Sequence, residues 1–345
     1  MKKLYYFGHS VKGSCDGGSS RNKAFRSSFL KKKAIMVPIY NTNLFIRFGS
    51  LLNVLRIMIL SKDNILFIHQ GTLIFLFPIS ILKFSWIRVL VFKLIQHTVN
   101  RNDVTIEVND LPYEQAIDLE LFVEETHKIF QDQLYALKNA KYVFASHEMG
   151  KYVYDTFKLN YKVIINGSNE INESSDSGKI HECFNSTETK FIYAGSLNKG
   201  RQIEALISIF SNRKEILILI GEWGEWMLDY KLSSNIFYLG KFQEEHAHYL
   251  TSKCDVGIIP YDETRFYYNI CYPTKASFYI TAGIPFLSTP LLELKNVFED
   301  SGIVYFVPFK EWESFINDFD IASFFDIKKR IKNEKYKFYW NDLLN

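Results

Sequence analysis

The sequence of 345 residues predicts an α/β chain built from two domains, each with a parallel sheet. Short apolar runs alternate with longer amphipathic runs, which is the pattern of repeated βαβ units. A stretch rich in Ser, Asn and Glu, without periodicity, separates two such series near residues 168–189. The chain is also long enough for two hydrophobic cores of ordinary size. We therefore expect two Rossmann-like domains that face a central cleft.

The first domain is expected over residues 1–168. Its six strands are expected at the short apolar runs of residues 3–7, 34–38, 64–69, 104–108, 142–145 and 163–165. Between residues 115 and 138, apolar side chains that include Leu119 and Phe122 recur at helical spacing.

The second domain is expected over residues 190–325, after a linker at residues 169–189. Its strands are expected at residues 190–194, 215–220, 236–239, 256–259, 285–288 and 304–307. The last segment, residues 326–345, is helical in pattern and could pack back on the first domain.

Composition argues against several classes of protein. The formal net charge is +3, so the overall charge does not favour nucleic-acid binding. The four cysteines form no C-x-x-C pair, which indicates neither a zinc cluster nor a disulfide framework. The first apolar run is too short for a signal peptide. We therefore expect a protein of the reducing cytoplasm.

The most apolar region of the chain, residues 65–95, is interrupted by polar and charged side chains. It is therefore not expected to span a membrane. Two interpretations remain open: buried strand and core helices, or an apolar surface lying against a membrane.

Lys275 lies two residues after a proline, at the start of an apolar run that ends in Gly-x-Pro. This pattern indicates a helix N-terminus, where unpaired N–H groups, the helix dipole and the lysine charge attract an anion. The alternative is a buried helix whose lysine extends to water.

A glycine turn follows the expected strand at residues 190–194. Gly195 lets the backbone approach a ligand, and Lys199 and Arg201 supply positive charge. The carboxyl ends of parallel strands converge on one crevice, so this turn and Lys275 are expected to hold one phosphate group. A simple basic turn is the alternative.

Two further strand ends in the second domain carry aromatic residues. Trp223 and Phe242 follow strands and could stack on a nucleotide base. The alternative is that they belong to ordinary turns or to the core.

Several segments resemble, in order, motifs of the GT-B glycosyltransferases, particularly the large retaining group called glycosyltransferase family 4. In the first domain the segments are ASHEM at residues 145–149 and VIINGS at 163–168. In the second domain they are YAGSLNKG at residues 193–200, CDVGIIPY at 254–261 and PTKASFYITAGIP at 273–285. The resemblance covers most of the chain and implies the GT-B fold.

The resemblance implies that the second domain binds a nucleoside-diphosphate sugar, with a UDP-sugar as the expected donor. The residues that would hold the diphosphate are Lys275, Lys199, Arg201, Gly195, Gly17 and Gly18. Those of the nucleotide and sugar pocket would be Trp223, Phe242, Tyr272 and Phe278. No metal or other cofactor is expected, because the cations and the helix N-terminus neutralise the leaving group.

One departure from the family pattern concerns two glutamates that many relatives carry. Ile270 and Phe278 stand at these positions. The usual residues contact the sugar and the ribose, so the departure leaves donor identity and retention of configuration open.

The resemblance also implies that the first domain binds the acceptor, a polysaccharide or lipid-linked glycan. His9 lies in a glycine-rich loop that matches the loop beneath the donor sugar, although a surface loop is the alternative. Asp110 follows a strand and could orient a sugar hydroxyl or take the acceptor's proton; a helix N-cap is the competing explanation. With Lys275, these are the expected catalytic residues. His69 is a further candidate, or a satisfied core residue.

Basic residues gather at residues 21–33, interleaved with Phe25, Phe29 and Leu30. Such a segment either forms a solvated helix face or contacts anionic lipid at the inner face of the membrane. Two functions other than catalytic transfer also stay open. They are a degenerate GT-B subunit that supports an active transferase, and an epimerase acting on a nucleotide sugar.

Overall fold

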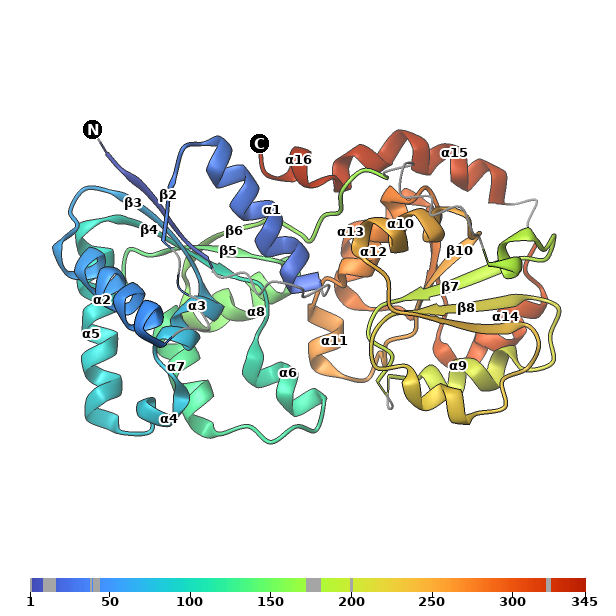
Figure 1. Cartoon of the computed structure of the whole chain (residues 1–345), viewed down its shortest axis with the longest axis horizontal. Coiled ribbons are helices and arrows are strands. Elements are labelled where there is room, and N and C mark those ends of the chain that lie inside the picture. The colour runs from blue at the N-terminus through green and yellow to red at the C-terminus, as the bar shows by residue number, and fades with distance from the viewer. Residues whose placement is uncertain are drawn as a thin grey trace. The chain divides into compact units, whose positions relative to one another are not determined.

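The computed structural model describes residues 2–8, 17–37, 39, 44–171, 181–198, 201–320 and 324–345. They form two compact units (Figure 1). Of the described residues, unit 1 contains 2–8 and those within 18–165, and unit 2 contains those within 166–343. Each unit is a parallel sheet with helices, so the predicted α/β fold is confirmed.

Unit 1 is built on a six-stranded sheet in the order β2-β1-β3-β4-β5-β6, in which every pairing is parallel. The strands are β1 (Leu4–Phe7), β2 (Ile35–Met36), β3 (Ile65–His69), β4 (Asp103–Val108), β5 (Lys141–Phe144) and β6 (Asn160–Val163). The last strand begins earlier than predicted, because it pairs with β5 in a register that joins Asn160 to Lys141.

The helices of unit 1 follow the strands of its sheet. They are α1 (Gly17–Lys31), α2 (Leu44–Leu60), α3 (Gln70–Leu76), α4 (Ile79–Leu82), α5 (Ser85–Arg101), α6 (Pro112–Asp118), α7 (Glu125–Tyr135) and α8 (His147–Phe157). Leu119 and Phe122 fall in the break between α6 and α7, so their assignment to a helix was wrong. Phe122 is 91% exposed there, so its side chain buries no apolar surface that would stabilise a helix across the break.

Unit 2 has a second six-stranded parallel sheet in the order β12-β11-β10-β7-β8-β9. Its strands are β7 (Lys190–Ala194), β8 (Ile216–Ile220), β9 (Ile236–Gly240), β10 (Val256–Ile259), β11 (Phe286–Ser288) and β12 (Val304–Phe306). Strands β7, β8, β10 and β11 are buried along their whole length, as expected of a sheet covered on both faces.

The helices of unit 2 are α9 (Ile203–Phe210), α10 (Glu244–Ser252), α11 (Phe266–Ile270), α12 (Thr274–Thr281), α13 (Leu292–Phe298), α14 (Trp312–Asn317), α15 (Phe324–Glu334) and α16 (Trp340–Leu343). Short 3-10 turns are η2 (Glu182–Asn185), η3 (Glu225–Asp229), η4 (Glu299–Ser301), η5 (Phe309–Glu311) and η7 (Lys335–Phe338).

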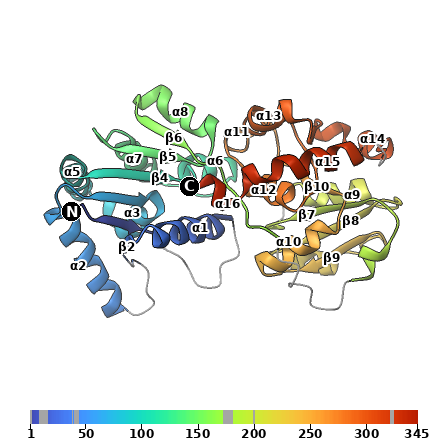
Figure 2. The same ribbon diagram turned by 90° about the horizontal axis from the view of Figure 1, so that it is seen from above.

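The C-terminal segment returns to the start of unit 2. Figure 2 shows the chain running from α15 through α16 to the C-terminus. The ring of Phe338 stacks on that of Phe298, with 5.2 Å between centroids. Ser168 N–H donates to the Phe338 carbonyl at 2.9 Å, and Trp340 N–H donates to the Ser168 carbonyl at 3.0 Å. These contacts anchor the segment within unit 2.

Candidate functional site

The candidate site lies at the carboxyl ends of β7, β8 and β10 in unit 2, where α12 begins. Tyr279 of α12 joins these elements, because its hydroxyl accepts from Ala194 N–H at 3.0 Å and donates to the Ile258 carbonyl at 3.1 Å. The N-cap of α12 is Pro273, and no side chain caps the helix. The first turn of α12 therefore lies at the sheet edge. No side chain caps its N–H groups, which form the positive end of the helix dipole.

Lys275, the second residue of α12, is only 9% exposed. Its Nζ donates to Tyr261 Oη at 3.1 Å and lies 5.0 Å and 5.3 Å from the ring centroids of Tyr193 and Tyr261. Among the described residues, no carboxylate forms an ion pair with this ammonium. Lys275 does not extend to water. The alternative interpretation, in which this lysine reaches from a buried helix to the solvent, was therefore wrong.

Burial is the main influence on Lys275, and it lowers the pKa of the ammonium below its ordinary value. Tyr193 opposes this shift, whereas the nearby Arg201 adds to it. A buried cation whose neighbours are neutral phenol groups carries a desolvation penalty that these groups offset only in part. An anion bound beside it would relieve that penalty.

Arg201 belongs to the same group of side chains. Burial lowers its pKa, but Tyr261, Tyr193 and Tyr268 outweigh burial and raise it. Arg201 and Tyr261 also line a small open cavity of ≈ 40 Å³ together with Gln202, Pro260, Asp262, Arg265 and Tyr268. The structure thus brings Lys275, Arg201 and Gly195 together, as predicted for these three residues.

Two glycines make this approach possible. Gly195 has φ +149°, and a Cβ added there would lie 2.5 Å from Lys275 Cε. Gly221 has φ +145°, and a Cβ there would lie 1.8 Å from the Gly195 carbonyl oxygen. No side chain fits between these turns, which explains why the strand ends carry glycine.

The Gly221→Ala variant is expected to lose both stability and anion binding. Its methyl group would collide with backbone that cannot move aside, in addition to strain of ~1–2 kcal/mol from positive φ. Gly283→Ala is the matched control, because Gly283 has φ +83° and nothing lies within 4 Å of an added Cβ. Urea unfolding should show a clearly larger loss for Gly221→Ala, and equal losses would contradict the steric argument.

The remaining predicted residues of unit 2 lie in different surroundings. Trp223 is 62% exposed with φ +66°, and Phe242 is half-buried with its ring 5.0 Å from that of His246. Tyr272 is buried, and its hydroxyl lies 2.8 Å from Ser277 Oγ. Ile270 is buried as well. Lys199 lies outside the described residues.

Phe278 packs beside a buried histidine. Its ring centroid lies 4.6 Å from that of His248, and the Phe278 carbonyl accepts from His248 Nε2 at 3.1 Å. Burial lowers the pKa of His248 to about 4. The apolar ring therefore stands beside a neutral imidazole.

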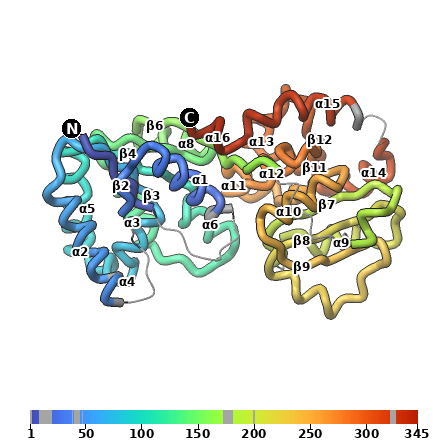
Figure 3. The backbone as a smooth tube through the Cα atoms, turned by 45° about the horizontal axis from the view of Figure 1, so that its top comes forward, coloured from blue at the N-terminus to red at the C-terminus, as the bar shows by residue number. Residues whose placement is uncertain are grey.

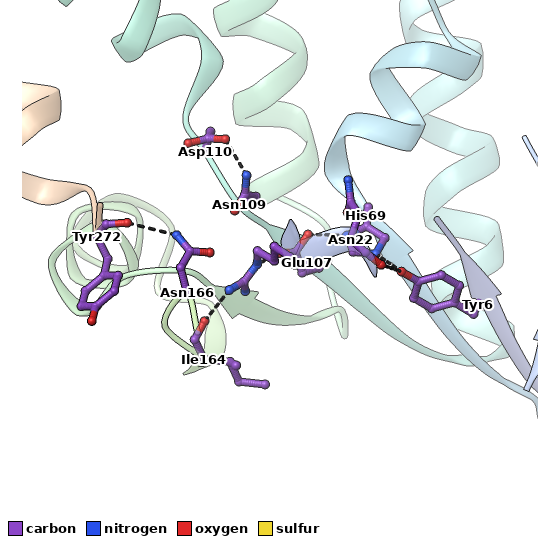
Figure 4. Close-up of polar contacts among 10 residues, drawn as sticks. Tyr6, Asn22, His69, Glu107, Asn109, Asp110, Ile164, Asn166 and Tyr272 are labelled. Carbon is purple, nitrogen blue, oxygen red and sulfur yellow. Dashed lines mark hydrogen bonds and ion pairs between the residues drawn. The ribbon is translucent and has the colours of Figure 1, made fainter. Parts of the chain in front are cut away.

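In unit 1, Asp110 follows β4 and is half-buried. Its Oδ2 accepts from Asn109 Nδ2 at 2.6 Å (Figure 4). The N-cap of α6 is Leu111, so the N-cap explanation for Asp110 was wrong. Gly17 and Gly18 form the first residues of α1, whereas His9 lies outside the described residues.

A buried polar cluster lies at the ends of β1, β3 and β4, and it makes His69 the satisfied core residue that was one of the two predictions for it. His69 Nε2 lies 2.7 Å from Tyr6 Oη, and His69 Nδ1 lies 2.5 Å from Glu107 Oε2. Arg21 Nε donates to Glu107 Oε1 at 2.5 Å, and Arg21 Nη1 donates to the Ile164 carbonyl at 2.8 Å. Figure 4 shows His69 between Tyr6 and Glu107.

Burial acts to raise the pKa of Glu107, but Arg21 and His69 outweigh it and lower the pKa to about 2. His69 is thus satisfied on both ring nitrogens. The carboxylate of Glu107, between Ile106 and Val108 in β4, was the signal that could have revealed this cluster, although not its partners.

The described residues contain no group of three or more His, Cys, Asp or Glu side chains placed to hold a metal ion. Among the helices described, none is both long and apolar enough to cross a bilayer.

The sequence matches no protein-family model and no curated protein. Solved structures similar to it include sucrose-phosphate synthase from Thermosynechococcus elongatus, at 11% identity and a TM-score of 0.66, covering 100% of this chain and 96% of that one. HepE from Anabaena in complex with UDP has 12% identity and a TM-score of 0.62, with 100% and 97% covered. A glycosyltransferase from Rickettsia africae has 13% identity and a TM-score of 0.59, with 99% and 96% covered. This likeness along the whole chain confirms the GT-B fold.

Proposed function

We propose that this protein is a glycosyltransferase that uses a nucleoside-diphosphate sugar, specifically a UDP-sugar, as its donor. The observation that carries the proposal is the buried Lys275 at the uncapped start of α12, beside Arg201 and the glycine turn. HepE, which shares the fold, has been solved with UDP and with UDP-glucose.

In the proposed reaction the bond between the sugar and the diphosphate breaks, and negative charge builds on the departing diphosphate. Lys275, Arg201 and the N–H groups of α12 would stabilise that charge as it develops, which is the main electrostatic contribution to such catalysis. These groups supply the positive charge that a metal ion supplies elsewhere, so we propose a metal-independent reaction. Resemblance to a retaining family supports retention of configuration.

We assign the acceptor, a polysaccharide or lipid-linked glycan, to unit 1. Asp110, with His9, would orient or deprotonate the acceptor hydroxyl. The cluster around Glu107 would hold the carboxyl ends of β3 and β4 in place near Asp110, because Glu107 lies three residues before it in the chain. The donor site is assigned to the groups around Lys275 in unit 2 and not to this cluster.

A second candidate function is a subunit that binds the nucleotide but does not turn it over. It is favoured by Phe278, whose ring packs on His248 where relatives carry a carboxylate. Ribose and sugar would then be held by other groups, or held too weakly for catalysis.

We further propose that the protein works in the cytoplasm, at the inner face of the membrane. Lys23, Arg26 and Lys31 are exposed on α1 and could contact anionic lipid. Arg21 and Phe25, however, are 1% and 2% exposed and cannot take part in such a contact.

Thermal unfolding with nucleotides tests the donor assignment. UDP at a hundred times its Kd is expected to raise the Tm of unit 2 by about 5 °C or more, because a ligand that binds only the folded state stabilises it. ADP and GDP serve as comparisons.

Release of UDP from a UDP-sugar separates the two candidate functions. Slow hydrolysis supports the transferase, and binding without turnover, even with acceptor extract, supports the subunit. Absence of any nucleotide-dependent shift would contradict both.

A further inference from the structure

Unit 1 exposes a large group of apolar side chains on α2 and around the start of α5. We call it the apolar face; its residues are Phe45, Ile46, Phe48, Leu52, Ile59, Leu60, Phe84, Trp86, Val89 and Leu90. Phe45 is 90% exposed, Trp86 68% and Leu90 61%. Figure 3 shows α2 and α5 side by side in unit 1. Many large apolar side chains left exposed on two neighbouring helices indicate an interaction site.

Helix α2 is apolar on two opposite sides. One side faces the core of unit 1, where Val54 and Met58 are buried and the Met58 carbonyl accepts from Thr98 Oγ1 of α5 at 2.9 Å. The other side carries Phe45, Phe48, Leu52 and Ile59 at the three- and four-residue spacings of a single helical stripe. A helix packed only against its own domain would need the first side alone.

Charge indicates what lies against the second side. Residues 44–101 contain seven Lys or Arg and a single acidic residue, Asp63. Arg56 lies on the exposed stripe of α2, and Lys93 is exposed one turn beyond Leu90 on α5. One base, Lys83, forms an ion pair with Glu124 at 2.8 Å. Apolar and aromatic side chains mixed with bases match the headgroup region of an anionic bilayer.

We infer that the apolar face is the main membrane-docking surface of this protein, lying in the headgroup region of an anionic bilayer. The inference deepens the membrane contact proposed above and rests on it, but it moves the principal contact from α1 to α2 and α5. No described helix is suited to cross the bilayer, so these helices would lie along the interface. An enzyme held there would meet a lipid-linked acceptor at the membrane surface.

Flotation with phosphatidylcholine vesicles, with and without phosphatidylglycerol, tests the inference. The full chain should float with the anionic vesicles, and Phe45→Asp and Leu90→Asp should each lower its partition by about tenfold or more. Leu228→Asp is the matched control, because Leu228 is 74% exposed in unit 2, and it should float like the wild type. All three substitutions affect exposed side chains, and circular dichroism should show an unchanged fold.

Three outcomes would overturn the inference. The first is a wild-type chain that stays in solution with every vesicle. The second is loss of flotation in a Lys31→Glu, Lys32→Glu variant while Leu90→Asp floats normally, which would place docking on α1. The third is a lipid-free dimer that Leu90→Asp dissociates, which would make a second copy the occupant. The Tm shift with UDP is measured on the same variants, so failure of the donor assignment is seen independently of flotation.

Discussion

Lys275→Met is expected to abolish most sugar transfer while leaving the fold intact or slightly more stable. Methionine keeps the length of the side chain but removes the charge, so the departing diphosphate loses its buried cation. Loss of one such electrostatic group typically lowers kcat by about 10²–10³-fold. The Tm without nucleotide should not fall, because a buried ammonium without a carboxylate partner is itself destabilising. UDP should no longer raise the Tm as it does in the wild type.

The control is Lys310→Met, which removes an exposed charge from the same unit. It should leave both kcat and the response to UDP unchanged. Full activity in Lys275→Met would refute the assignment of Lys275 to the diphosphate. A large fall in Tm without nucleotide would instead make Lys275 a structural residue.

The Glu107→Gln variant is expected to lower the free energy of unfolding of unit 1. It should also make that free energy depend less on pH in the acid range. Removing one partner from a buried charge cluster leaves Arg21 without its carboxylate, which costs roughly 3–5 kcal/mol. The folded pKa of Glu107 is lowered from 4.5 to about 2, so its stabilisation is fully present above pH 4.5. It is lost as pH falls toward 2, because the unfolded state then binds more protons than the folded state. This lowering of the Glu107 pKa corresponds to about 3 kcal/mol in the free energy of unfolding.

Hydrogen exchange of peptides from β3 and β4 measures this effect, since a two-unit chain need not unfold in one step. Protection of these peptides should fall in Glu107→Gln at pH 7 and should depend less on pH below 4.5 than in the wild type. Glu125→Gln, an exposed glutamate of the same unit, should behave like the wild type. Equal protection in both variants would show that the cluster contributes little to stability.

Much of the fold was predictable because its signals are local. The alternation of apolar and amphipathic runs located both sheets, and β7, β8 and β10 begin and end within a residue or two of the predicted runs. Errors arose where packing overrides local pattern. The helical spacing that included Phe122 ended in an exposed loop, and edge strand β6 was displaced by its pairing with β5.

The candidate site was predictable in part. Glycines at strand ends and a lysine after Pro273 are visible in the sequence, and their convergence follows from the parallel sheet. The phenol groups of Tyr193 and Tyr261 around Lys275 were not predictable, because they come from residues 82 and 14 positions away in the chain.

Local sequence signals were thus enough to predict the two α/β units, the turns at their strand ends and a lysine at the start of α12. These depend on periodicity, glycine and proline, which act over a few residues. Packing of the folded chain established that Lys275 is buried with no carboxylate partner in the described part of the chain, and that Arg21, His69 and Glu107 form one cluster. It also established that α2 keeps an apolar side outside the core. The environment of a side chain is set by residues that are distant in the chain, and they meet only when strands and helices pack.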